Sequence, residues 1–255
     1  MSLANGEETR TRELRIVSGA SPREFLTARE NLKVRVRPYQ PADRPAIRKL
    51  CCDTGFLGNP IDSVFRDRDL FADLFTGAYL AYEPEWALVA EVNGRLVGYL
   101  LGSVRKDFDQ LLMRYGFPIA AKMCFRWVRR RYAAHPRSAG FVRWLLSRGY
   151  HEQPKHPADA AHLHLDLDDA YRGRGVARRL WETYEKQLCE AGIDQCYGAF
   201  FSHPQRRPEP VYARYGFTEF DRKPTTLFSP ELSDVEVVCV RKFLANGANG
   251  VNGAH

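Results

Sequence analysis

The sequence lacks several features that define special classes of protein. It contains no internal repeat, no linker long enough to separate two domains, and no hydrophobic run that could cross a bilayer. The polar N-terminus has no signal-peptide core. The six cysteines show no Cys-x-x-Cys spacing. These absences argue against a repeat protein, a membrane protein and a disulfide-stapled secreted domain. They predict a cytoplasmic protein with reduced thiols.

The composition is that of a globular protein, with an excess of positive charge. Of 255 residues, 44% are hydrophobic and 27% charged, and the net charge is +7. Residues 103–160 carry twelve Lys or Arg against four Asp or Glu, a net of +8. Two interpretations are open for the arginines at 126 and 129–131. They form the solvated face of a helix, or a basic rim that attracts an acidic substrate, a nucleic acid or cofactor phosphates. No aromatic–basic motif of a nucleic-acid module is present, which argues against nucleic acid.

Hydrophobic periodicity predicts one domain over residues 32–244, with a mobile arm at 1–31 and a disordered tail at 245–255. Residues 32–37 alternate as a first strand. Asp43 is an expected N-cap of a first helix, and a second helix is expected over 66–82. Asn93-Gly94 between two apolar runs predicts a hairpin with a type I′ turn. Residues 103–160 form a basic helical insertion with two expected inner faces: Ile119, Met123, Trp127 and Val128, then Phe141, Val142, Leu145 and Leu146.

The stretch AHLHLDLDDAYRGRGVA at 161–177 organises the rest of the chain. Its first half alternates as a strand with one buried face. One side takes Leu163, Leu165 and Leu167, and the other takes His162, His164, Asp166 and Asp168. The second half is a small basic turn that leads into an amphipathic helix. A strand, a glycine-rich turn and a helix start together favour an anion site, because the first N–H groups of the helix are free and glycine lets a phosphate approach.

The chain after that helix predicts a buried strand over 195–201, a rigid loop, a short helix in VYARYGF, and strands before and at 235–244. This element order, with RGRGVA and VYARYGF about forty residues apart, resembles the GNAT superfamily of acyl-CoA-dependent N-acyltransferases. The family's turn pattern is matched by Arg172, Gly175 and Ala177. Its later pattern is matched by Tyr212, Gly216 and Phe217. The resemblance implies a mixed, mostly antiparallel twisted α/β sheet flanked by helices, with acetyl-CoA as co-substrate.

A closer resemblance involves three further stretches: residues 37–55, residues 77–103 and the AHLHLDL strand. They are similar to the acetyltransferase-like domain attached to O-GlcNAcases and to its free-standing bacterial relatives. Those relatives also carry a helical insertion before the central strand. The implied function is transfer of an acetyl group to an amine. A non-catalytic acyl-CoA-binding or interaction module is the alternative, and a nucleic-acid or acidic-partner binder that uses the insertion is a weaker one.

Acetyl-CoA would need a backbone edge for its pantetheine and a cradle for its pyrophosphate. The pantetheine can pair like an extra strand with the backbone of Leu165 and Leu167. The N–H groups and side chains of the turn are the expected pyrophosphate ligands. These cofactor-binding candidates are Arg172, Gly173, Arg174, Gly175, Val176 and Ala177. Many family members have an asparagine near the position of Gln205. Its absence here leaves Arg206 or Arg207 as substitutes toward a CoA phosphate.

Direct attack by an amine on the thioester requires a neutral amine and protonation of the leaving thiolate. A phenol has a reference pKa of about 10 and a thiol of about 8.5, so Tyr212 is the candidate acid. His162, His164 and Asp166, which share one strand face, are the candidate bases, with His164 and Asp166 favoured. A hydrogen-bonded structural histidine is the other interpretation of His164. No cysteine or carboxylate is expected to complete a metal site from the chain's scattered histidines. The expected acceptor is a small-molecule or peptide amine; no membrane partner is expected, and a homodimer is compatible with the sequence.

Overall fold

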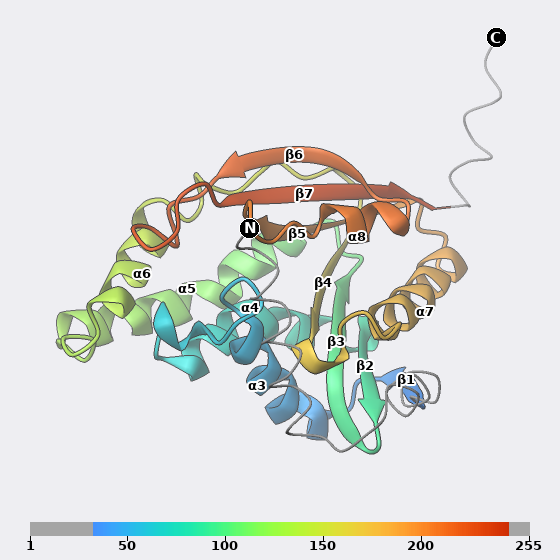
Figure 1. Ribbon diagram of the computed structural model, residues 1–255, viewed down its shortest axis with the longest axis horizontal. Helices are drawn as coiled ribbons and strands as arrows, with labels where there is room; N and C mark the ends of the chain where they lie inside the picture. Colours follow the sequence, from blue (N-terminus) through green and yellow to red (C-terminus); the bar gives the residue numbers. More distant parts are fainter. Residues whose placement is uncertain (1–32, 245–255) are drawn as a thin grey trace, which may run out of the picture. The chain divides into compact units, whose positions relative to one another are not determined.

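A seven-stranded sheet organises the part of the chain that the computed structural model describes, residues 33–244 (Figure 1). The predicted arm at 1–31 and tail at 245–255 lie outside the described residues. The strand order is β1-β2-β3-β4-β5-β7-β6, and only β4 and β5 are parallel neighbours. This confirms the mixed, mostly antiparallel fold. The strands are β1 (Val34–Pro38), β2 (Ala87–Val92), β3 (Arg95–Ser103), β4 (Ala161–Leu167), β5 (Gln195–Ser202), β6 (Thr218–Pro224) and β7 (Glu236–Phe243).

The hairpin of β2 and β3 forms where Asn93-Gly94 predicts it. Both turn residues have positive φ, 51° at Asn93 and 76° at Gly94, as a type I′ turn requires. The strand after the turn runs to Ser103, two residues beyond the Arg95–Leu101 run that predicts it. The extra residues allow β3 to pair with β4 from Leu167 to His162, which lies opposite Ser103. The hairpin therefore fixes the register of the central strand.

Helices cover both faces of the sheet (Figure 1). α7 (Val176–Glu190) packs on one face, against β1 to β4. α3 (Arg44–Thr54) and α4 (Arg68–Tyr82) pack on the other, mainly against β3 and β4. The predicted inner face of α7 is confirmed, because Val176, Leu180, Tyr184 and Leu188 are buried. Its close approach to β3 depends on Gly102, where a Cβ would lie 2.4 Å from the Tyr184 ring.

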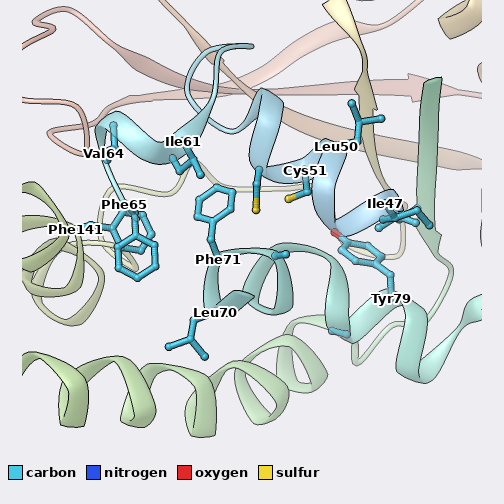
Figure 2. Close-up of a cluster of buried hydrophobic side chains, with 14 of the residues drawn as sticks. Ile47, Leu50, Cys51, Ile61, Val64, Phe65, Leu70, Phe71, Tyr79 and Phe141 are labelled. Carbon is cyan, nitrogen blue, oxygen red and sulfur yellow. The ribbon is translucent and has the colours of Figure 1, made fainter. Parts of the chain in front are cut away.

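The main core lies between α3, α4 and the inserted helices (Figure 2). α5 (Phe108–Val128) and α6 (Pro136–Ser147) form this insertion. Phe141 of α6 stacks on Phe65 with ring centroids 4.4 Å apart, and Phe65 is fully buried. Rings of this size bury large apolar areas, so the insertion shares one core with the helices of the sheet. It is not a separate appendage.

Three residues that the sequence predicts on the inner faces of the insertion are exposed. Val128 is 73% exposed, Leu146 is 51% exposed and Trp127 is 36% exposed, whereas Met123 and Phe141 are buried. Val128 is the last residue of α5, so its position in the helical period does not bring it over the core. Leu146 stands one residue from the end of α6 and points away from the Phe141 face. Periodicity alone does not show where along its length a helix stops packing against other elements.

The basic residues of the insertion are partly paired. Arg126 forms an ion pair with Asp67, so it does not belong to a purely solvated face. The Arg129 guanidinium lies 5.0 Å from the centroid of the Phe125 ring. A cavity of about 500 Å³ opens between α6 and the segment before β7. Its lining includes Arg137, Arg143 and Arg148. The excess charge is therefore distributed over several local environments.

The remaining helix boundaries follow the proline and capping signals with small shifts. Asp43 occupies the N-cap of α3, but its carboxylate binds Arg37 and the Gln40 N–H in place of the helix N–H groups. α4 begins at Arg68, two residues later than predicted. α8 (Glu209–Arg214) starts after Pro208, as the prolines predict. None of the helices within residues 33–244 is both long and apolar enough to cross a membrane.

Candidate active site

The central feature of the site is an opening between β4 and β5. The two strands pair in parallel only from Ala161 to Leu163, opposite Cys196 to Gly198. Beyond Leu163 they diverge, although β4 continues to Leu167 and stays paired with β3. Leu165 and Leu167 therefore lie on a stretch of strand with no partner on its β5 side. Unpaired backbone N–H and C=O groups at a strand edge are a template for an extended ligand.

The turn between β4 and α7 ends at a helix start without a cap. Gly173 and Gly175 have φ of 70° and 78°, a conformation that favours glycine, and an added Cβ at either would meet open space. Gly175 is the N-cap of α7, and no side chain caps the helix or places a carboxylate in its first turn. The first N–H groups, including those of Val176 and Ala177, are thus available to an anion. The turn is open as well as glycine-rich.

The arginine side chains of the turn do not converge on this helix start. Arg172 pairs with Asp169 at 2.6 Å and donates to the Gly58 carbonyl at 3.4 Å. The Arg174 guanidinium lies over the Tyr171 ring. The turn therefore offers mainly its backbone N–H groups, while Arg172 reaches toward the loop after α3. That loop contains Gly58.

Tyr212 lies on the face of the sheet that α7 covers. It lines an apolar cavity of about 60 Å³ together with Leu163, Leu165, Trp181 and Tyr215. Its ring stacks on Phe200 of β5 with centroids 4.6 Å apart. Burial raises the pKa of the Tyr212 phenol, with a further contribution from the Asp166 charge. Tyr212 therefore remains protonated well above neutral pH.

His164 and Asp166 lie on the opposite face of β4 and contact each other. His164 Nε2 is 3.4 Å from the Asp166 carboxylate. The Tyr99 hydroxyl lies between them, donating to Asp166 at 2.5 Å and standing 3.2 Å from His164. Burial alone would raise the pKa of Asp166, but hydrogen bonds from His164 and Tyr99 and the charge of His164 hold it below its usual value. Asp166 is therefore an ionised carboxylate at neutral pH.

Cys51 of α3 completes this polar cluster, which corrects the expectation that no cysteine or carboxylate joins a histidine here. Ligand atoms of Cys51, His164 and Asp166 all lie within 4.8 Å of one another. Burial and the Asp166 charge raise the pKa of the Cys51 thiol well above its usual value. A protonated thiol is a poor metal ligand, so the arrangement fits a hydrogen-bonded cluster. The scattered histidines considered from the sequence do not form this set, apart from His164.

His162 shares the strand face of His164 but not its surroundings. Its Nδ1 is 2.8 Å from the Tyr79 hydroxyl, and its ring stacks on Tyr197. Burial lowers its pKa to about 3, aided by the charges of His164 and His156. It is a neutral, packed histidine over the physiological range. No register shift interrupts the pairing of β3 with β4, so the two histidines face the same side.

Sequence reasoning missed the residues that tie this cluster together. Tyr99 lies directly opposite Asp166 in the β3–β4 register, and Thr54 at the end of α3 also hydrogen bonds to Asp166. Neither position carries a motif. The tyrosine in VGYLLGS could have been found only by assigning the antiparallel register of β3 against β4. Gln205 is exposed, and Arg206 is partly buried.

The geometry is suited to acyl transfer. An extended thioester could pair with the open edge of β4, place its phosphates at the start of α7, and expose its carbonyl between the two faces. One face then presents a protonated phenol and the other an ionised carboxylate with a histidine. A proton donor and a proton acceptor on opposite sides are what aminolysis of a thioester requires.

A comparison with known proteins finds a family match in the region of the candidate site. The sequence model of the acetyltransferase (GNAT) domain matches residues 149–226. Residues 149–226 are thus similar to a GNAT acetyltransferase domain. This similarity supports an N-acetyltransferase enzyme with acetyl-CoA as its co-substrate. The GNAT match spans β4, the turn, α7, β5 and α8, so it includes the strand opening and Tyr212. Cys51 and Tyr99 lie outside it.

Solved structures support the fold over most of the chain. SsHAT is similar over 82% of this chain and 98% of its own, at 25% identity and a TM-score of 0.53. An N-acetyltransferase from Staphylococcus aureus Mu50 is similar over 83% of this chain and 98% of its own, at 11% identity and a TM-score of 0.50. Naa20 of Chaetomium thermophilum, solved with a bisubstrate analogue, is similar over 85% of this chain and 90% of its own, at 16% identity and a TM-score of 0.50. A search of curated protein sequences gave no match.

Proposed function

We propose that the enzyme transfers the acetyl group of acetyl-CoA to an amine by direct attack of that amine on the thioester. The observation that carries this proposal is the opening between β4 and β5. It is flanked by Tyr212 on one face and by the His164–Asp166 pair on the other. The acceptor is a small-molecule or peptide amine.

The backbone of the domain holds the co-substrate. The free edge of Leu165 and Leu167 would pair with the pantetheine amides. The N–H groups from Gly173 to Ala177 would hold the pyrophosphate, because the helix start is uncapped and both glycines leave open space. This assignment depends on backbone groups, which explains why the Arg172 side chain can point elsewhere.

The His164–Asp166 pair serves as the base. The carboxylate accepts a hydrogen bond from Tyr99 and lies beside His164 Nε2, so it holds the imidazole in one orientation. An incoming ammonium can lose its proton to this pair directly or through one water molecule. His162 does not serve this purpose, because a pKa of about 3 makes it too weak a base.

Tyr212 serves as the acid. Its raised pKa keeps the hydroxyl protonated, and the hydroxyl would donate to the departing CoA thiolate. Tyr215 lines the same cavity, and the sequence motif selects Tyr212 over it. The thiolate leaves as CoA with the proton of Tyr212. The ammonium loses two protons in forming the amide: one passes to the His164–Asp166 pair, and the other restores the Tyr212 hydroxyl.

The closer similarity to the O-GlcNAcase-linked domain and its bacterial relatives belongs to this proposal. Its support is the shared sequence stretches, together with an insertion that packs before the central strand in this fold. The cytoplasm is the proposed location, since the buried Cys51, Cys52, Cys196 and Cys239 are thiols. A non-catalytic acyl-CoA-binding module is the competing function. It would share the turn and the strand opening but would not need the His164–Asp166–Tyr99 cluster.

Calorimetric titration with acetyl-CoA, followed by a thiol-release assay over sugars, amino acids, polyamines and peptides, tests the proposal. Gly175→Glu places a carboxylate at the helix start and should abolish acetyl-CoA binding. Gly192→Glu is the matched control, because Gly192 also has a positive φ and open space but lies at the other end of α7. Binding that survives in Gly175→Glu, or no binding by the native enzyme, contradicts the proposal. Tight binding with no thiol release from any acceptor favours the non-catalytic module.

A further inference from the structure

Two arginine side chains meet at one point beside the candidate active site. A Cβ placed on Gly58 would lie 2.7 Å from Arg172 Nη2 and 2.8 Å from Arg206 Nη2. Gly58 also has a φ of 86°, a backbone conformation that favours glycine. Three segments converge here: the turn before α7, the loop after β5, and the loop after α3. They bring together two positive charges that are far apart in the sequence.

The negative charge around the two guanidinium groups does not neutralise both of them. Arg172 is paired with Asp169. Arg206 forms no side-chain hydrogen bond or ion pair with any residue from 33 to 244; Asp166 and Asp169 act on it only as more distant charges. Burial lowers the pKa of Arg206, and repulsion from Arg172 lowers it further. A partly buried guanidinium under like-charge repulsion is a favourable place for an anion.

The position of Arg206 relates this anion to the reacting centre. Its charge offsets a small part of the rise in the pKa of Tyr212, and the Asp166 charge acts on both Tyr212 and Arg206. Thr54, which hydrogen bonds to Asp166, stands four residues before Gly58 in the loop that receives the two arginines. The arginine pair is therefore a neighbour of the proposed base as well as of the proposed acid.

We propose that Arg206, supported by Arg172, binds an anionic group carried by the acceptor, so that the substrate is an amine with a carboxylate or phosphate a few bonds away. This rests on the proposed acetyl transfer. A guanidinium offers paired donors that match a carboxylate or a phosphate. The acceptor's positive end then points to the His164–Asp166 pair and its negative end to the arginines. This charge separation selects compact zwitterionic amines over polyamines.

The arginine pair could also bind a phosphate of acetyl-CoA, so the experiment distinguishes an anion on the acceptor from a phosphate on the co-substrate. The thiol-release assay uses matched acceptors: amino acids, their carboxamides, their decarboxylated amines, and an aminoalkyl phosphate. The native enzyme should prefer the anionic acceptors by about 10- to 100-fold in kcat/KM, as a charged hydrogen-bond pair predicts. Arg206→Gln should remove this preference through KM and leave the rate with carboxamides unchanged. The preferred anion, carboxylate or phosphate, identifies the substrate class.

Calorimetry with acetyl-CoA supplies the second measurement. The acetyl-CoA Kd of Arg206→Gln should equal that of the native enzyme, and so should that of Arg214→Gln, which removes an exposed charge from the nearby α8. Arg214→Gln should also keep the acceptor preference. A Kd weakened by Arg206→Gln, with equal loss for every acceptor, assigns the arginine to a CoA phosphate and overturns the inference. So does a native enzyme that acetylates carboxamides as fast as amino acids.

Two controls keep the outcome clear. Arg206→Lys retains the charge but loses the forked donors, and it should recover part of the preference for anionic acceptors. Thermal unfolding of Arg206→Gln should show no loss of stability, because the substitution removes a like-charge contact. If the native enzyme binds no acetyl-CoA, the proposed function fails. If it acetylates amines without regard to their anions, only the present inference fails.

Discussion

The two faces of β4 show how one strand can supply two different environments. The face toward α7 carries Leu163 and Leu165 and borders an apolar cavity with Tyr212. The face toward α3 and α4 carries His162, His164 and Asp166, each with a polar contact. Residues one position apart in sequence therefore lie in apolar and in polar surroundings. Strand alternation normally separates core from solvent; here it would separate the proposed pantetheine channel from the proposed proton-transfer cluster.

Removing the charge of the polar face should have the largest effect. Asp166→Asn replaces the carboxylate that accepts from Tyr99 and orients His164. We expect kcat to fall roughly 100-fold or more, as for loss of general-base function. The acetyl-CoA Kd should not change, because the co-substrate site uses the other face and the turn. The measurement is steady-state thiol release beside calorimetry.

Asp159→Asn is its control, because this exposed carboxylate pairs only with Lys106 on the surface. Native-like turnover in Asp166→Asn would place the base elsewhere and leave the cluster a structural role.

Shortening the apolar face should lower stability next. Leu163 is 3% exposed and packs against Gly198, so Leu163→Ala should cost about 2–4 kcal/mol of unfolding free energy by leaving a cavity. Leu165→Ala should cost roughly 1 kcal/mol or less, because Leu165 already borders a cavity and stays partly exposed. Urea unfolding measures both. Leu165→Ala should instead weaken acetyl-CoA binding, and equal stability losses in the two variants would show that the face has no open channel.

Removing the proton donor on the apolar face should reduce the rate without affecting binding. Tyr212→Phe keeps the stacking on Phe200 but loses the hydroxyl, and kcat should fall about 10- to 100-fold. Because the pKa of Tyr212 is raised, the native enzyme should show no loss of rate from deprotonation of this phenol up to pH about 10. Tyr215→Phe should have little effect on kcat. The decisive result is the pH–rate profile of the three proteins.

The smallest effect concerns the histidine that the polar face keeps neutral. The pKa of His162 is about 3 in the folded protein, against about 6.5 for a histidine in the unfolded chain. Between these two pKa values the unfolded chain binds a proton on His162 that the folded protein does not bind. The contribution of His162 to the free energy of unfolding is therefore fully present above pH 6.5 and is lost as the pH falls below it. The loss is up to about 1.4 kcal/mol per pH unit.

His162→Gln should flatten this slope, measured by urea unfolding from pH 7 to 4.5. His151→Gln, at an exposed position, should leave the slope as it is. An unchanged slope in His162→Gln would mean that other groups cause the acid sensitivity.

Local signals predicted the scaffold of the site, whereas long-range register determined its chemistry. Asn93-Gly94 has only one favourable turn conformation, and the helix after Gly175 carries its own hydrophobic period. Both could therefore be predicted from nearby residues. The contact of Asp166 with Tyr99 depends on how β3 pairs with β4 across a long insertion, and the meeting of Arg172 with Arg206 depends on three loops. Sequence periodicity has no information about such pairings.

The short pairing of β4 with β5 has a mechanical consequence. Three residue pairs join these strands, whereas eight join β5 to β7. The two halves of the sheet are thus connected through a narrow bridge, and a bound pantetheine chain would extend that bridge by supplying the absent rungs. Loading the enzyme should then slow amide hydrogen exchange around Leu165 and raise the melting temperature. Release of CoA must break those rungs again, which makes departure of product a natural slow step of the cycle.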